Sequence, residues 1–177
     1  VDNNLDIIFT DNPTWRAAVT SVTVNGTALN PGDYLLTAGN LQLIPSNGNT
    51  LLTTAGSKNV VIFATNYLDA PVVQQINAGA FVAANSTTAI NLPLTINTSR
   101  TVTCTAKDQY NNLVSGYTFR LDIQVIDNSI TTDESYTVDG TAYTSTPSPV
   151  NLVSATNASG ISTFGITIPA LVDQNDG

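Results

Sequence analysis

The sequence predicts an all-β protein made of two tandem β-sandwich domains, and three observations support this. Hydrophobic residues make up 42% of the 177 residues and charged residues only 10%, so threonine and asparagine fill most polar positions. Threonine is β-branched and fits a pleated surface, whereas long periodic stretches of helix-forming residues are missing. Short runs of alternating apolar and polar residues recur along the chain and are separated by turn residues. The length allows one large or two small domains.

The first half opens with an expected strand, Leu5-Asp6-Ile7-Ile8-Phe9. Asp11-Asn12-Pro13 then has the pattern of a helix start, with a capping side chain followed by proline at the first helical position. We expect Trp15–Val19 to form one short helical turn whose tryptophan packs inward.

The strongest local signal is the Asn25-Gly26 pair between alternating residues, which predicts a type I′ hairpin. A two-residue loop places Val24 opposite Thr27 and Val22 opposite Leu29. Four further strands or strand-like segments are expected in this half, at Tyr34–Leu36, Leu41–Ile44, Lys58–Thr65 and Pro71–Ile76. The small residues of Asn77–Ala80 mark a flexible boundary, so we assign the domains to 1–78 and 79–177.

The second half is organised around Thr101–Asp127, two expected strands joined by a corner. Val102, Cys104 and Ala106 alternate with threonines, and Phe119–Val125 alternates in the same way. The corner begins at Asp108 and is rich in residues that bond their own backbone.

A second hairpin is predicted at Asp139-Gly140, with Tyr136 opposite Tyr143 and Val138 opposite Thr141. Later strands are expected at Asn151–Ala155 and Ile161–Ile168.

Charge and composition exclude several functions. The net charge is −8 with five Lys and Arg, so the clustered cations that nucleic acid requires are missing. No apolar run is long enough to span a bilayer, and we expect no membrane insertion. With no His, and no Ser or Cys in a nucleophile turn, we predict that the chain is not an enzyme. The single Cys104 is expected to be a small core residue.

Two candidate sites follow from the polar and aromatic residues. Calcium is the metal that clustered turn carboxylates would bind, and the alternative is ordinary solvated loop charge. The candidate ligands are Asp108, Asp127, Asp133, Glu134, Asp173 and Asp176. Tyr136 and Tyr143 form the second candidate, an aromatic platform for a sugar ring, with hairpin packing as the alternative.

The first half resembles a known family. Trp15, the Val22–Gly26 segment, Asp33-Tyr34 and the Ala64–Ala70 segment with its Tyr-Leu-Asp-Ala sequence are similar to the haemoglobin-interacting domain family over about residues 5–77. That family recurs in Gram-positive surface proteins and secreted glycan-degrading enzymes. Without His or Met, haem could be ligated only by Tyr or Cys104, so we do not extend haemoglobin binding to this chain.

The second half resembles bacterial Ig-like domains of the invasin and intimin type, through Thr105–Gly116 and Ala155–Thr163. Asn111 stands where that family usually has Gly, and Leu113 where it has Pro. The resemblance implies two Ig-like β-sandwiches cut from a larger extracellular protein of a bacterial cell surface or wall.

The composition is similar to that of surface-layer (S-layer) proteins, so the first hypothesis is a structural role with other copies or neighbouring domains as partners. The alternatives are a carbohydrate-binding or spacer pair that contacts polysaccharide, and an adhesin stalk.

Overall fold

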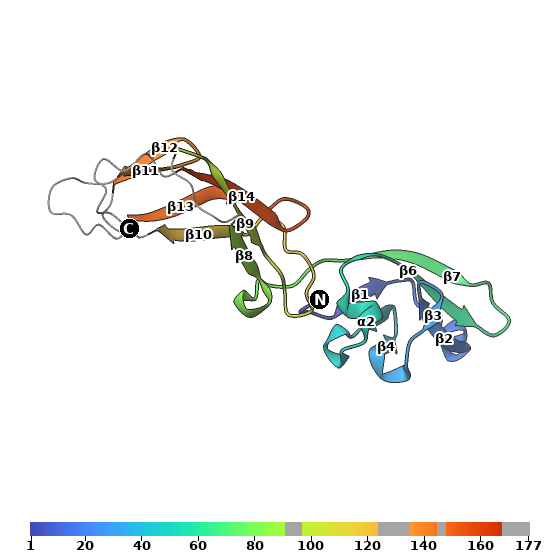
Figure 1. The fold of residues 1–177 in the computed structure, drawn as a ribbon. Helices are drawn as coiled ribbons and strands as arrows, with labels where there is room; N and C mark the ends of the chain where they lie inside the picture. Colours follow the sequence, from blue (N-terminus) through green and yellow to red (C-terminus); the bar gives the residue numbers. More distant parts are fainter. Residues whose placement is uncertain (91–96, 124–134, 145–147, 168–177) are drawn as a thin grey trace. The chain divides into compact units, whose positions relative to one another are not determined.

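The computed structural model describes residues 1–90, 97–123, 135–144 and 148–167 (Figure 1). Over these residues the chain consists mainly of antiparallel β-strands with few, short helices, so the predicted all-β class is confirmed. The chain divides into two compact units, Val1–Ala80 and Phe81–Gly177. Among the described helices, none has the length and apolar character needed to cross a membrane.

The first unit contains two antiparallel sheets, one with the order β1-β5-β4 and one with the order β3-β2-β6-β7. Two short α-helices and two 3₁₀ turns connect the strands. The bounds are β1 Leu5–Ile8, α1 Pro13–Ala17, β2 Val19–Val24, β3 Thr27–Ala28, η1 Pro31–Asp33, β4 Tyr34–Thr37, β5 Asn40–Leu43, η2 Pro45–Asn47, α2 Thr50–Thr53, β6 Gly56–Ala64 and β7 Ala70–Ile76.

The core of the first unit draws on both sheets. Alternate residues of β2 and β6 are buried, and so are alternate residues of β5, which matches the half-buried pattern of the sequence. The helix α2 contributes Leu52. The fully buried apolar residues of this core are Val22, Val24, Leu41, Leu43, Leu52, Val60 and Ile76.

The Asn25-Gly26 hairpin forms as predicted. Both residues have positive φ, 50° and 82°, and Val24 lies opposite Thr27. The N–H of Leu29 donates to the carbonyl of Val22 at 2.9 Å, which carries the expected pairing one step further.

The predicted helix start is also confirmed, but the helix occupies Pro13–Ala17 and ends earlier than expected. Val19 belongs to β2, where it pairs with Ala64, because a β-branched residue at this position extends the sheet rather than the helix. The helix α2 was not predicted; four residues are too few to give a periodic signal.

The second unit is a sandwich of a five-stranded sheet, ordered β12-β11-β14-β9-β8, and a pair, β10-β13. Its bounds are η3 Ala83–Asn85, β8 Thr87–Ile90, β9 Arg100–Thr105, β10 Thr118–Ile123, β11 Ser135–Val138, β12 Thr141–Thr144, β13 Ser148–Ala155 and β14 Ile161–Thr167. Phe119 of β10 packs against a buried cluster from the larger sheet, so the two sheets face each other. That cluster consists of Val102, Cys104, Tyr136, Val138 and Phe164.

Candidate functional site

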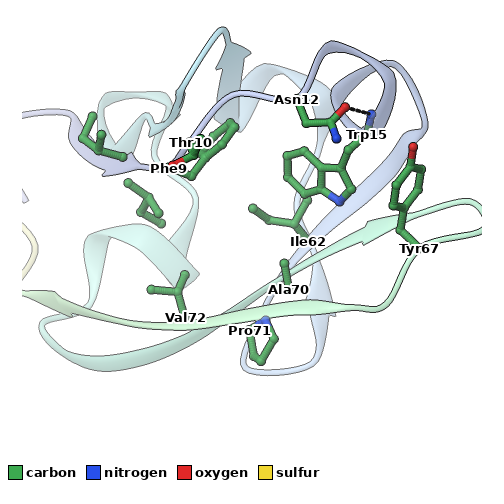
Figure 2. Close-up of a pocket in the computed structure, with 11 residues that line it drawn as sticks. Phe9, Thr10, Asn12, Trp15, Ile62, Tyr67, Ala70, Pro71 and Val72 are labelled. Carbon is green, nitrogen blue, oxygen red and sulfur yellow. Dashed lines mark hydrogen bonds between the residues drawn. The ribbon is translucent and has the colours of Figure 1, made fainter.

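An apolar groove with a volume of about 400 Å³ lies in the first unit. Side chains from β1, from α1 and from the region where β6 turns into β7 converge on it (Figure 2). None of the lining residues is charged. They are Ile7, Ile8, Phe9, Thr10, Asn12, Trp15, Ile62, Tyr67, Ala70, Pro71 and Val72.

Asn12 sets the position of the tryptophan in this groove. Its side-chain Oδ1 accepts hydrogen bonds from the backbone N–H of Thr14 at 3.0 Å and of Trp15 at 3.1 Å, which caps α1 (Figure 2). Pro13 at the first helical turn favours the same backbone geometry. The ring of Trp15 then meets Phe9 edge to face, with centroids 5.3 Å apart. A five-residue helix thus holds a large aromatic side chain at the groove wall.

The turn between β6 and β7 supplies a further part of the lining. Asn66 adopts a positive φ of 68°, and the N–H of Tyr67 donates to the carbonyl of Ala64 at 3.1 Å. This tight turn leaves Tyr67 partly exposed at the groove and Leu68 exposed by 92%. On β1, Ile8 lines the groove and is 74% exposed. Large apolar side chains therefore face water around one concavity, which is typical of an interaction site.

The electrostatics do not favour acid–base chemistry at this groove. Arg16 of α1 and Asp11, just before the helix, form an ion pair with a distance of 3.0 Å. On β1, hydrogen bonds from Asn40 and then Gln42 hold the pKa of Asp6 below its ordinary value of 3.8, so Asp6 stays ionised. What the groove offers is apolar surface with a few hydrogen-bonding groups.

Asp108, a candidate calcium ligand, lies in the second unit and is fully buried. Its Oδ1 accepts from the backbone N–H of Tyr110 and of Asn112, at 2.8 and 2.9 Å, and its Oδ2 accepts from Asn112 Nδ2 at 2.8 Å. These bonds fold the corner between β9 and β10, where Asn111 takes a left-handed conformation with φ 66°. The carboxylate is occupied by the loop itself, which is a structural role.

The other candidate calcium ligands, Asp127, Asp133, Glu134, Asp173 and Asp176, lie outside the described residues. Within the described part of the chain, no group of three or more Cys, Asp or Glu side chains could hold a metal ion. Calcium binding therefore stays a prediction.

Tyr136 and Tyr143 lie opposite each other in the β11–β12 hairpin, as predicted, with stacked rings 5.6 Å apart. The exposed sugar platform does not form, because Tyr136 is only 2% exposed and belongs to the core of the second unit. Alternation places Tyr136 on the same face as Val138, and that face points inward. Tyr143 is partly buried and packs against the same cluster.

The comparison with known families bears on the unit that contains the groove. Residues 1–77 match the family described as the haemoglobin-interacting domain of haem-binding Shr-like proteins. The resemblance of the first half to that family is thus supported. The match indicates a binding rather than a catalytic type of module, from surface proteins of Gram-positive bacteria.

The match favours a location at the cell surface or outside the cell. No curated protein and no solved structure matches the chain. The Ig-like and S-layer resemblances of the chain stay predictions.

The groove was missed at the sequence level, although two signals pointed to it. The run Ile7-Ile8-Phe9 breaks strand alternation and leaves an apolar side chain on the solvent face. Tyr67-Leu68 puts two large apolar residues in a turn, where polar residues are usual.

Proposed function

We propose that this chain is a non-catalytic assembly segment of a bacterial surface protein, and that its first unit makes protein–protein contacts through the apolar groove. The observation that carries the proposal is the uncharged groove, whose lining includes the exposed side chains of Ile8 and Tyr67. When a protein partner covers apolar side chains around a concavity, apolar surface is removed from water, which stabilises the complex. The match of residues 1–77 to a haemoglobin-interacting domain supports the same kind of role.

The composition of the chain supports assembly with other copies or with neighbouring domains of the parent protein, as in an S-layer. Only 10% of the residues are charged, so a copy presents few ions that must be desolvated at a contact. The net charge of −8 keeps copies apart except where an uncharged surface is presented. We include calcium at the joints between domains in this proposal, because the cation would offset the repulsion between negatively charged copies.

Sedimentation velocity over a concentration series, with calcium and with EGTA, tests the proposal. We expect the wild-type chain to associate as its concentration rises, and Ile8→Asp to stay monomeric because a carboxylate would have to be desolvated at the groove. Leu35→Asp is the matched control. Like Ile8, Leu35 is an exposed branched aliphatic residue on an outer strand of the sheet β1-β5-β4, but it does not line the groove. If the wild-type chain stays monomeric at every concentration, assembly is contradicted and the stalk or spacer role remains.

Haemoglobin is a second candidate partner, because the matched family is named for that interaction. Among the groove-lining residues, Tyr67 is the one whose side chain is of a type that ligates haem iron, and Cys104 is buried in the other unit. Sedimentation of a mixture, followed at the haem absorbance band, tests this candidate. Co-sedimentation that Ile8→Asp abolishes and Leu35→Asp retains would support it, and haemoglobin sedimenting alone would rule it out.

A further inference from the structure

The strand β7 has an open edge. The sheet order β3-β2-β6-β7 places it at one side of the four-stranded sheet (Figure 1). It pairs with β6 from Ala70 opposite Ile62 to Ile76 opposite Gly56, without a break in register. Within the described ranges, no strand pairs with its other side. The outward backbone N–H and C=O groups of such a strand can accept a further strand.

The composition of β7 lacks most of the features that protect edge strands. Proteins block open edges with charged side chains, with bulges, or by keeping the strand short. The sequence Ala-Pro-Val-Val-Gln-Gln-Ile carries no charge, and Pro71 near one end is its only blocking residue. Val73, at the centre, is 70% exposed. With seven residues, β7 is also the longest outer strand of the first unit.

This edge is continuous with the groove. Ala70, Pro71 and Val72 of β7 line one side of the groove, and Ile7 and Ile8 of β1 line the other. A strand added to β7 would alternate its side chains between the two faces of the sheet. The side chains on the inner face would therefore lie toward the apolar groove, while main-chain hydrogen bonds hold the strand in place.

We propose that β7 pairs antiparallel with the β7 strand of a second copy, joining the two four-stranded sheets into one. An antiparallel strand pair related by a two-fold axis at Val73 places each Val73 opposite its counterpart, and Val72 opposite Gln74 of the second copy. No like charges meet in this register, although each copy carries a net charge of −8. The uncharged, self-complementary edge favours a second copy over an unrelated strand.

This inference deepens the proposed assembly function, on which it rests. Sedimentation velocity of Val73→Lys against wild type tests it, with Leu35→Lys as the matched control on the outer strand β4. In a two-fold pair the two lysines would lie directly opposite each other, which is destabilising. We expect Val73→Lys to lose the concentration-dependent rise in sedimentation coefficient and Leu35→Lys to keep it. Both side chains are exposed, so both variants retain the fold.

Cross-linking adds a register-specific measurement. The single native thiol, Cys104, is buried, so an introduced cysteine reports alone. Under mild oxidation we expect Val73→Cys to form a disulfide-linked dimer and Leu35→Cys to form no covalent dimer. Association by Val73→Lys equal to wild type, or no dimer from Val73→Cys, would overturn the edge pairing and leave groove-mediated assembly standing. A wild-type chain that never associates would overturn both proposals.

Discussion

The Oδ1 atom of Asn12 accepts the backbone N–H of Trp15 at 3.1 Å, and this bond fixes where the aromatic wall of the groove stands. The same atom accepts the N–H of Thr14 at 3.0 Å, so one short side chain satisfies two free donors of α1. Trp15 in turn meets Phe9 edge to face. The geometry of the groove therefore depends on the capping side chain of Asn12.

Replacing Asn12 by Ala is expected to lower the free energy of unfolding by about 0.5–2 kcal/mol, the usual range for losing a cap. It is also expected to weaken self-association, because Trp15 loses the bond that positions it. Asn49→Ala is the control for association: Asn49 caps α2 through the N–H of Leu51, also donates to Asp33 at 2.7 Å, and does not line the groove. Chemical denaturation and sedimentation separate the two effects. Equal loss of association in both variants would contradict a specific role for Asn12.

Tyr136→Phe is expected to be neutral or stabilising. The hydroxyl of Tyr136 is buried and has no hydrogen-bond partner among the described residues, so its removal deletes a polar group that is poorly solvated in the folded state. Tyr136→Ala, in contrast, should cost about 3–5 kcal/mol, the range for emptying an aromatic core position. Thermal and chemical unfolding of the two variants measure both effects. Destabilisation of Tyr136→Phe by as much as Tyr136→Ala would contradict this account.

The same residue predicts a pH dependence. Burial, and then the neighbouring Tyr143, raise the pKa of Tyr136 above its ordinary value of 10.0. Because burial penalises the ionised form, the folded state keeps its full stability below pH 10.0 and loses stability as pH rises through the folded pKa. We expect Tyr136→Phe to unfold at a higher pH than wild type in an alkaline titration, and Tyr143→Phe to shift less. An unchanged alkaline midpoint in Tyr136→Phe would contradict the prediction.

For Asp6 we predict a loss of stability at acidic pH, in contrast to the alkaline effect of Tyr136. Its pKa is lowered by hydrogen bonds from Asn40 and Gln42, so its stabilising contribution is present above pH 3.8 and is lost as pH falls through the folded pKa. Asp6→Asn should therefore lose less stability than wild type on acidification, by a small amount because Asp6 is exposed. Asp69→Asn, at an exposed turn carboxylate, is the control. A steeper acid loss in Asp6→Asn than in wild type would contradict the assignment.

Asp108→Ala is expected to destabilise the second unit by about 1–3 kcal/mol for each buried donor left unpaired. The N–H groups of Tyr110 and Asn112 both depend on its Oδ1. We expect the loss to be the same in calcium and in EGTA, because the loop itself occupies the carboxylate. A loss seen only with calcium present would instead identify Asp108 as a calcium ligand. Unfolding of both units followed in each buffer distinguishes these results.

Local sequence patterns predicted much of the fold because the structure follows local rules at those places. Asn25-Gly26 and Asp139-Gly140 take positive φ at both positions, and each hairpin has the register that a two-residue loop requires. Alternation along β9 correctly indicated that Val102 and Cys104 are buried. These features are decided by neighbours in the chain.

Tertiary structure decides where the groove forms and whether the predicted site residues are exposed or buried. Local sequence patterns do not contain this information. Trp15, Tyr67 and Ile8 come from three separate elements, and only the folded unit brings them to one concavity. Alternation shows that Tyr136 lies on one face of its strand but does not show whether that face meets water or Phe164. For Asp108, composition indicated a polar turn, and only the folded loop shows that its carboxylate is used internally.

The fluorescence of Trp15 during dilution tests the central claim most directly, because it is the only tryptophan of the chain and lines the groove. If copies associate through the groove, diluting the wild-type chain should shift the emission toward that of a more solvated indole, in parallel with dissociation seen by sedimentation. Ile8→Asp should show the solvated emission at every concentration. Dissociation without any change in Trp15 emission would contradict the account, because the contact would then lie elsewhere on the molecule.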